Sequence, residues 1–252
     1  MHAPILVTGG TGTLGRQVVP LLRAAGRDVR VLTRTACKPA DGVEYVVGDL
    51  LAGTGIEQAV EGIEVVVHLA GGPKGDDKAT AALVAAAKPA GVRHIVLISV
   101  IGADTVPLGY LRAKEGAEKL LAASGIGYSI VRAAQFHDLT LTMVRGMAKL
   151  PVVPVPGLRL QPVDSGEVAA RIAELALDRP AGRVADLAGP KVYPMRELVD
   201  GYLAASGKHR LRMPVWLPGR AGRAYRAGAN LSVAGASRGG RTWEEFLAEA
   251  IA

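Results

Sequence analysis

The chain has 252 residues, is 49% hydrophobic and only 4% aromatic, and carries a formal net charge of +7. A chain of this length buries a large core, and its 32 glycines with few aromatic residues favour an α/β fold over a β-sandwich. The single cysteine, Cys37, excludes a disulfide within the chain, and no apolar run reaches the roughly 18 residues of a membrane span.

The first half of the chain alternates short apolar runs with helical patterns. The predicted strands consist almost entirely of Val, Ile and Leu, which indicates burial on both faces, as in a parallel sheet covered by helices. Right-handed crossovers then bring the carboxyl ends of the strands to one edge of the sheet, where ligands bind. Strands are predicted at 5–7, 29–33, 43–47, 64–69, 94–98 and 128–131, and helices at 14–25, 76–87 and 110–123.

The first predicted helix has marked signals inside it and at its end. Gly26 is placed to end the helix in a left-handed cap, whereas Pro20 lies inside it and should kink it. The residues expected to share its apolar face are Leu14, Val18, Leu21, Leu22 and Ala25.

Beyond Arg132 the alternation is less regular. A helix is predicted at about 135–148, a proline-rich stretch of extended edge pieces or stiff loop at 150–162, a helix at 165–177, and then an irregular tail. Nothing in the sequence resembles a linker, so we expect one domain over residues 1–252 with a small carboxyl-terminal lobe starting at about residue 135.

The segment TGGTGTLG, residues 8–15, lies between the first strand and the first helix. Glycines there let the backbone turn tightly and approach a pyrophosphate, while the helix amino terminus supplies N–H groups and partial positive charge. The motif predicts a Rossmann-type doubly wound sheet whose dinucleotide-binding core extends to about residue 134. Its expected cofactor contacts are Gly9, Thr11, Gly12, Thr13, Leu14 and Gly15.

The residue after the second strand indicates which dinucleotide is bound. An NAD site usually has an acidic residue there for the ribose hydroxyls, but this chain has Arg34. A guanidinium binds a 2′-phosphate bidentately, and Arg16 is placed to reach the same group. The sequence therefore predicts NADP(H) as the cofactor.

Two further turns follow the third and fourth strands, at residues 48–50 and 69–72. Asp49 can accept a hydrogen bond from the adenine amino group, and the small residues at 70–72 permit close approach of the adenosine ribose. We expect cofactor contacts from Asp49, Leu50, Leu69, Ala70 and Gly71.

Catalytic candidates are found after the fifth strand. Ser99 ends that strand, and Tyr110 and Lys114 are four residues apart on the next helix, so they share a helical face. An ammonium beside a phenol lowers the phenol pKa and can also hold a cofactor ribose.

These motifs, with the segment YLRAK at 110–114, resemble the short-chain dehydrogenase/reductase superfamily. The segment RAAQFH at 132–137 and QPVD at 161–164 are similar to its atypical, NmrA-like branch. The resemblance implies Tyr110 as general acid, Ser99 as a hydrogen-bond donor to the substrate, and Lys114 as the ribose ligand. Because Gln135, Phe136 and His137 follow the sixth strand, we expect them to border the nicotinamide end, and we expect cofactor contacts from Ala133, Gln135 and Phe136. The Asn of the main branch has no equivalent here.

Two functions follow from this resemblance, because the branch contains both enzymes and sensors. The first is an NADPH-dependent reductase of a small carbonyl, enone, imine or quinone; the second is a non-catalytic NADP(H) redox sensor. A sugar-nucleotide epimerase would need a larger lobe after Gln135. We expect a cytoplasmic protein with a small-molecule substrate, no metal, no membrane partner and no nucleic acid, since the basic segment 201–243 is typical of a solvated surface.

Overall fold

The computed structural model describes residues 3–38, 40–72, 74–232 and 235–251. The chain divides into two compact units. The first comprises Met1–Ser99, Gly109–Val131 and Val168–Val184, and the second Val100–Leu108, Arg132–Glu167 and Ala185–Ala252. The expectation of a single domain over the whole chain stays a prediction.

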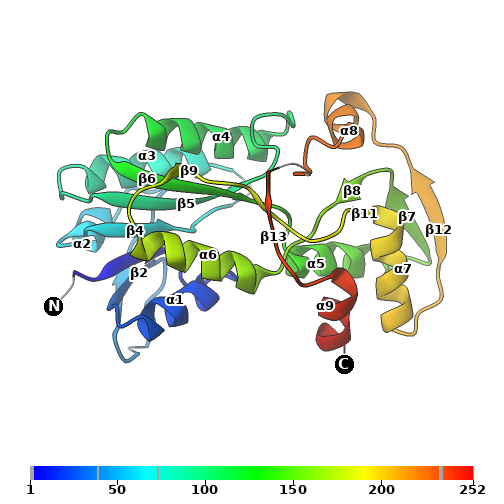
Figure 1. Ribbon diagram of the computed structural model, residues 1–252, viewed down its shortest axis with the longest axis horizontal. Coiled ribbons are helices and arrows are strands. Elements are labelled where there is room, and N and C mark those ends of the chain that lie inside the picture. The colour runs from blue at the N-terminus through cyan, green and yellow to red at the C-terminus, as the bar shows by residue number, and fades with distance from the viewer. Residues whose placement is uncertain (1–2, 39, 73, 233–234, 252) are drawn as a thin grey trace. The chain divides into compact units, whose positions relative to one another are not determined.

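The first unit is built on a mostly parallel sheet (Figure 1). The strands follow the order β3-β2-β1-β4-β5-β6, with β9 (Gly182–Arg183) paired to β6. This order and the parallel ladders confirm the predicted doubly wound sheet. Their bounds are β1 Ile5–Thr8, β2 Val29–Thr33, β3 Val43–Val47, β4 Val65–His68, β5 His94–Val100 and β6 Gly127–Ala133.

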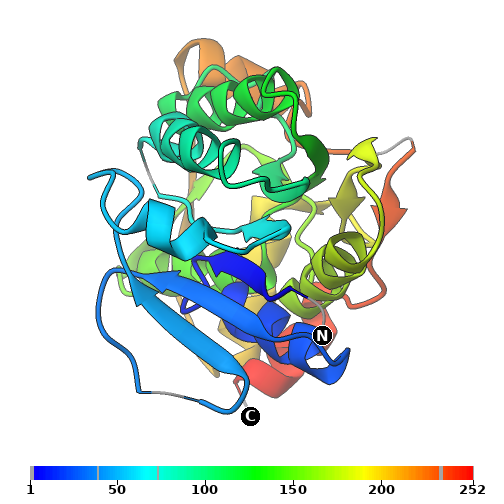
Figure 2. The ribbon, with the colours of Figure 1, turned by 90° about the vertical axis from the view of Figure 1, so that its left-hand side faces the viewer.

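Helices cover both faces of this sheet (Figures 1 and 2). Helices α1 (Gly15–Ala24) and α6 (Ser165–Leu177) lie on one face, and α2 (Ile56–Val60), α3 (Asp76–Ala87) and α4 (Gly109–Ala122) on the other. Leu83 of α3 and Leu121 of α4 are fully buried in one cluster with strand residues such as Leu6 and Ile95. Burial of this apolar surface is what holds the helices on the sheet. Helix α2 was not predicted.

Helix α1 ends as its sequence predicts. Gly26 has a φ of 74°, and the amides of Gly26 and Arg27 donate to the carbonyls of Arg23 and Leu22, the two bonds of a Schellman motif. Pro20 lies inside the helix. The predicted apolar face was partly wrong: Leu14, Val18 and Leu22 are buried, but Leu21 and Ala25 are exposed. The buried residues recur every four positions, so the apolar face of the helix is narrower than the five predicted residues would make it.

The second unit has its own core of aromatic and aliphatic side chains, including Tyr193, Met195 and Trp243. The proline-rich stretch forms edge strands as predicted: β7 (Val152–Pro156) pairs with β12 (Leu211–Val215), and β8 (Arg159–Leu160) pairs with β11 (Tyr193–Pro194). Its other elements are α5 His137–Met147, β10 Leu187–Ala188, α7 Met195–Ala205, α8 Gly219–Arg226, β13 Ser237–Arg238 and α9 Trp243–Ala250.

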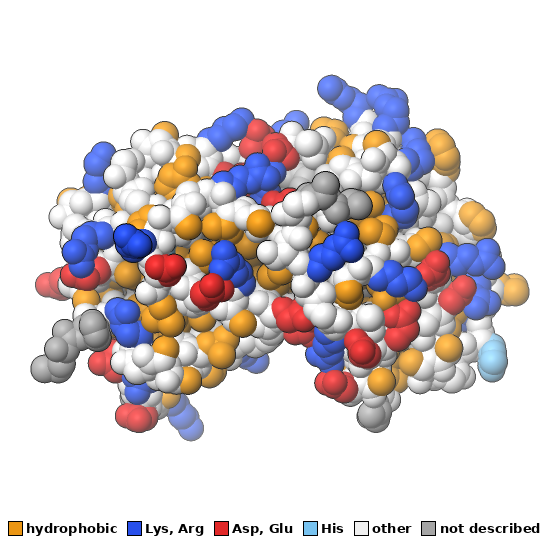
Figure 3. Space-filling view, viewed as in Figure 1, with side chains coloured by type: hydrophobic (Ala, Val, Ile, Leu, Met, Phe, Trp, Pro, Cys, Tyr) orange, Lys and Arg blue, Asp and Glu red, His pale blue; other side chains and the backbone are white. Residues whose placement is uncertain are grey.

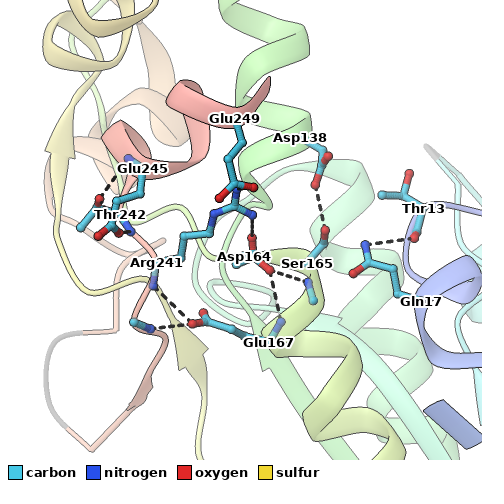
Figure 4. A network of polar contacts seen from close by, with 12 residues as sticks. Thr13, Gln17, Asp138, Asp164, Ser165, Glu167, Arg241, Thr242, Glu245 and Glu249 are labelled. Carbon is cyan, nitrogen blue, oxygen red and sulfur yellow. Dashed lines mark hydrogen bonds and ion pairs between the residues drawn. The ribbon is translucent and has the colours of Figure 1, made fainter. Parts of the chain in front are cut away.

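A polar network ties the carboxyl-terminal segment into this second unit (Figure 4). The Arg241 guanidinium lies 2.7 Å from Asp164 and 2.6 Å from Glu249, and Glu167 accepts hydrogen bonds from the amides of Gly240 and Arg241. Burial of Asp164 is outweighed by its hydrogen bonds from Arg241 and from backbone amides, which hold its pKa below the ordinary value. Within the described ranges no helix is long and apolar enough to cross a membrane.

Candidate functional site

The glycine-rich turn joins β1 to α1 and leaves no room for side chains at two of its positions. A Cβ at Gly9, whose φ is 71°, would lie 2.7 Å from the amide nitrogen of Ala70. A Cβ at Gly15 would lie 2.2 Å from the carbonyl oxygen of Gly9. The turn is closed by a hydrogen bond from the Gly12 amide to the Gly9 carbonyl. Helix α1 has no acidic residue in its first turn, so its amino terminus keeps its partial positive charge for an anion.

A cavity of about 430 Å³ opens beside this turn. Its walls come from the carboxyl ends of β1, β2, β3 and β4, all in the first unit. Most predicted contacts line it: Gly9, Thr11, Gly12, Arg34, Asp49, Leu50, Leu69, Ala70 and Gly71. Thr13, Leu14 and Gly15 do not; Leu14 is buried and Gly15 shapes the turn. Further lining residues that the sequence reading missed include Leu32, Leu51, Lys74, Asp76 and Ala79.

Arg34 is the cation at the end of β2. It is exposed, it lines the cavity, and among the described residues it has no ion-pair partner. Arg16 is also exposed, and its Nε donates to the Thr11 carbonyl at 2.8 Å. The cavity therefore offers a guanidinium with unused donors at the position where a 2′-phosphate is expected.

Asp49 shapes the turn in which it lies. One of its carboxylate oxygens accepts the amides of Leu51 and Ala52 at 2.7 and 3.2 Å. The Oδ1 atom is used within the turn, so an adenine amino group would donate its hydrogen bond to Oδ2.

A buried chain of hydrogen bonds links three walls of the cavity. The Ala70 amide donates to Thr8 Oγ1, which lies 2.7 Å from His68 Nδ1. His68 Nε2 lies 3.1 Å from Thr80 Oγ1, which donates to the Asp76 carbonyl. These directions fit a neutral His68 that carries its proton on Nε2. Burial, with a smaller contribution from Lys114, lowers the pKa of His68 to about 4, so the chain is intact at neutral pH.

Lys114 forms a buried ion pair with Asp76. The two charged atoms, Nζ and Oδ2, are 2.8 Å apart, and the other Asp76 oxygen accepts the Gly72 amide at 2.8 Å. A Cβ at Gly71 would lie 3.1 Å from the Lys114 ammonium, so the ammonium lies directly beneath the turn at 69–72. Asp76 was not among the predicted site residues. Asp76 lies in the first turn of α3, shortly after the predicted cofactor loop, and this position in the sequence could have marked it as a site residue.

Tyr110 lies near this pair with 37% of its surface exposed. The Lys114 ammonium is 5.9 Å from the centroid of its ring. Burial, together with the negative charge of Asp76, raises the pKa of the Tyr110 phenol to about 12. The expectation that Lys114 lowers this pKa was wrong, because burial of the phenol and then the charge of Asp76 raise the pKa instead.

Ser99, Ala133, Gln135 and Phe136 complete the predicted site residues. Ser99 is 1% exposed, its hydroxyl has no hydrogen-bond partner, and within the described ranges no hydrogen bond joins it to Tyr110. Ala133, Gln135 and Phe136 belong to the second unit, and their contact with the cofactor stays a prediction. In the described part of the chain no three His, Cys, Asp or Glu side chains are grouped to hold a metal.

The fold and this cavity define a Rossmann-type protein that binds a nicotinamide dinucleotide. The family model described as NAD(P)H-binding matches residues 9–179, and the chain belongs to this family. That membership confirms the predicted class of protein.

Three similar curated proteins are reductases by name. The NAD(P)H azoreductase of Xenophilus azovorans is 29% identical over 81% of this chain and 74% of its own length. A (4-alkanoyl-5-oxo-2,5-dihydrofuran-3-yl)methyl phosphate reductase of Streptomyces griseus is 32% identical, over 77% and 70%. Quinone oxidoreductase 2 of Escherichia coli is 27% identical, over 81% and 75%.

Solved structures share the fold. An Escherichia coli NADPH-dependent quinone oxidoreductase complexed with NADPH superposes with a TM-score of 0.83 at 21% identity, covering 98% of this chain and 100% of that one. A nucleoside-diphosphate-sugar epimerase from Staphylococcus aureus gives a TM-score of 0.81 at 22% identity, covering 97% and 99%. The family match and the NADPH-bound fold support the predicted NADP(H) cofactor.

Proposed function

We propose that this protein is an NADPH-dependent reductase that delivers a hydride to a small, electron-poor conjugated acceptor such as a quinone or enone. The observation that carries the proposal is the cavity lined by the glycine turn and Arg34, with the amino terminus of α1 directly after that turn. The names of three relatives, which specify azo, quinone and dihydrofuranone-type substrates, support an acceptor of this chemical class. Simple carbonyls and imines are the other acceptors to be tested as substrates. We place the activity in the cytoplasm because Cys37 has no partner cysteine in the chain.

The residues present fit the dinucleotide. Gly9, Thr11 and Gly12 of the turn line the cavity beside the amino terminus of α1, where a diphosphate is expected. The missing side chain at Gly9 lets the turn pack against the backbone of Ala70 and keep this shape. The cofactor supplies the hydride when bound. Lys114 is held beneath Gly71 by Asp76 and donates a second proton to the Ile98 carbonyl, so its third proton is the one we assign to the ribose hydroxyls.

Tyr110 is the proposed proton donor. With a pKa of about 12 the phenol is fully protonated at neutral pH, so it can donate to an acceptor oxygen or nitrogen as negative charge develops there. The same pKa makes its phenolate form scarce, so Tyr110 is a poor base for the reverse, oxidative reaction. Because Ser99 is buried, we assign the donation to Tyr110 alone.

The test is NADPH oxidation measured by absorbance against a panel of quinones, enones, azo dyes, carbonyls and imines, with NADH in parallel. Tyr110→Phe should reduce kcat by about tenfold to a thousandfold while the affinity for NADPH is retained, because only proton donation is removed. Tyr45→Phe, on β3 away from the cavity lining, is the matched control. Turnover unchanged in Tyr110→Phe would remove Tyr110 as the acid.

A non-catalytic NADP(H) sensor is the second candidate. The inaccessible hydroxyl of Ser99 and the pairing of Lys114 with Asp76 favour it, since neither side chain is free for a proton relay. Tight NADPH binding without turnover on any member of the panel would establish this function in place of the reductase.

A further inference from the structure

Strands β7 and β12 form a two-stranded parallel ribbon in the second unit, in which the inner side of β7 faces the core. Successive side chains of a strand point to opposite faces, and register partners on adjacent strands point to the same face. Val153 and Val155 of β7 are buried in the core cluster, so the alternate residues of that strand, Val152 and Pro154, point outward.

The outward face of this ribbon is apolar where water would favour polar residues. The register pairs Val152 with Leu211 and Pro154 with Met213, which places all four side chains on the outer side. Leu211 is 73% exposed and Met213 52% exposed. A sheet with one buried face normally alternates apolar inward and polar outward residues, so this face lacks a partner.

Basic residues flank the apolar face at both ends. Lys149, Lys208 and Arg210 are exposed at the start of the ribbon, and Arg220 is exposed at the start of α8. From residue 201 to residue 243 the chain has eight lysines and arginines and no acidic residue. In Figure 3 basic and hydrophobic side chains lie along the right-hand side, with acidic ones among them, where Figure 1 places β12 and α8.

Trp216 directly follows β12 and is 70% exposed. The guanidinium carbon of Arg226 lies 3.9 Å from a ring centroid of Trp216, so the arginine stacks on the indole and holds it at the surface. Exposed tryptophan beside arginine is typical of the boundary between acyl chains and headgroups in a bilayer.

We propose that the outer face of the β7–β12 ribbon, with Trp216, docks on the surface of an anionic phospholipid bilayer. Leu211, Met213 and Trp216 enter the headgroup–acyl boundary, while the flanking lysines and arginines contact lipid phosphates. The contact is peripheral. It goes beyond the proposed reductase activity, and it revises the expectation of no membrane partner and of a merely solvated basic segment.

Charge favours a bilayer over a second copy of this chain. Because both ends of the apolar face are basic, a two-fold dimer through the ribbon would bring cations of one copy towards cations of the other. Asp200 of α7 is already paired with Arg212 of β12 at 2.6 Å. An anionic surface instead complements both the cations and the apolar residues between them.

The test is flotation of the full chain with vesicles of phosphatidylcholine alone or mixed with phosphatidylglycerol. Binding to the anionic vesicles should be at least about tenfold tighter and should weaken with added salt. Tryptophan emission should shift to the blue on binding. The chain has two tryptophans, and because Trp243 is already buried the shift should vanish in Trp216→Phe.

The double variant Leu211→Ser/Met213→Ser should lose about tenfold or more in vesicle affinity. Leu139→Ser, which changes an exposed leucine of α5, is the matched control and should bind as the wild type does. NADPH affinity should be unchanged in all these variants, which keeps this outcome separate from that of the reductase proposal.

Three results would overturn the docking proposal. Equal binding to neutral and anionic vesicles, or none, would exclude the anionic surface. A dimer in sedimentation velocity without vesicles, abolished by Leu211→Ser/Met213→Ser, would make the ribbon a self-association interface. Binding of duplex DNA that displaces the vesicles and leaves Trp216 emission unshifted would assign the cations to nucleic acid instead.

Discussion

Arg34 is the residue on which cofactor choice depends. It follows β2 at the position where NAD sites have an acid, and its guanidinium has no carboxylate partner among the described residues. Arg34→Ala should weaken NADPH binding about tenfold to a hundredfold, because a charge-assisted contact to the 2′-phosphate is lost, and should leave NADH binding nearly unchanged. Calorimetric titration of both dinucleotides measures this.

Lys38→Ala is the matched control, because Lys38 is an exposed cation of the same loop that does not line the cavity. An equal loss of NADPH affinity in both variants would show that only overall charge matters.

Asp76 and Lys114 form a unit whose members depend on each other. Asp76→Asn leaves a buried ammonium without its counter-charge and should lower the free energy of unfolding by about 3 kcal/mol. Lys114→Met should cost a similar amount, for the converse reason. The double variant should be less destabilised than the sum, because neither charge is then stranded. Urea unfolding of the four proteins gives the coupling energy, and strict additivity would contradict the pairing.

At the scale of elements, the glycine turn works as one piece with the start of α1. A Cβ at Gly15 meets backbone atoms of Gly9 and Gly10 that cannot move without opening the turn. Gly15→Ala should therefore destabilise the protein by at least about 2 kcal/mol and reduce NADPH affinity more than tenfold. Thermal unfolding and NADPH titration check the two effects.

Gly146→Ala on α5 is the control, since its Cβ meets nothing within 4 Å. It should stabilise α5 slightly through helix propensity and leave cofactor binding unchanged. If Gly15→Ala likewise leaves stability and NADPH affinity unreduced, cofactor binding does not depend on the close packing of the turn.

At the scale of the whole molecule, buried neutral histidines predict acid sensitivity. The pKa of His68 is about 4 in the folded protein because of burial, while in the unfolded chain it is the ordinary 6.5. Below pH 6.5 the unfolded chain takes up a proton that the folded one does not, so stability present at neutral pH is lost as the pH falls towards 4. The free energy of unfolding should drop by about 2 kcal/mol between pH 7 and pH 5 from this residue.

Urea unfolding at several pH values measures the slope. His68→Phe should be less stable at pH 7, because Thr8 and Thr80 lose their partner, but its stability should depend less steeply on pH. His137 is fully buried and its pKa is likewise lowered to about 4, so His137→Phe should also flatten the profile. An unchanged slope in both variants would contradict the neutral, buried state of these rings.

Much of the fold and part of the site follow from local pattern. Continuous apolar strands predict the parallel sheet, the residues at 8–15 predict the dinucleotide turn, and Gly26 predicts the end of α1, because each depends on neighbours within a few residues. The edge strands β7 and β8 follow in the same way from the prolines that cannot join the interior of a sheet.

Only the tertiary structure decided which charges meet. The ion pair of Lys114 with Asp76, and with it the raised pKa of Tyr110, requires α3 and α4 to pack side by side, and no spacing in the sequence encodes that contact. The burial of Ser99 and the apolar outer face of the β7–β12 ribbon likewise arise from strand pairing over long sequence separations. Local sequence fixes backbone geometry, whereas side-chain electrostatics and exposure depend on which segments the fold brings together.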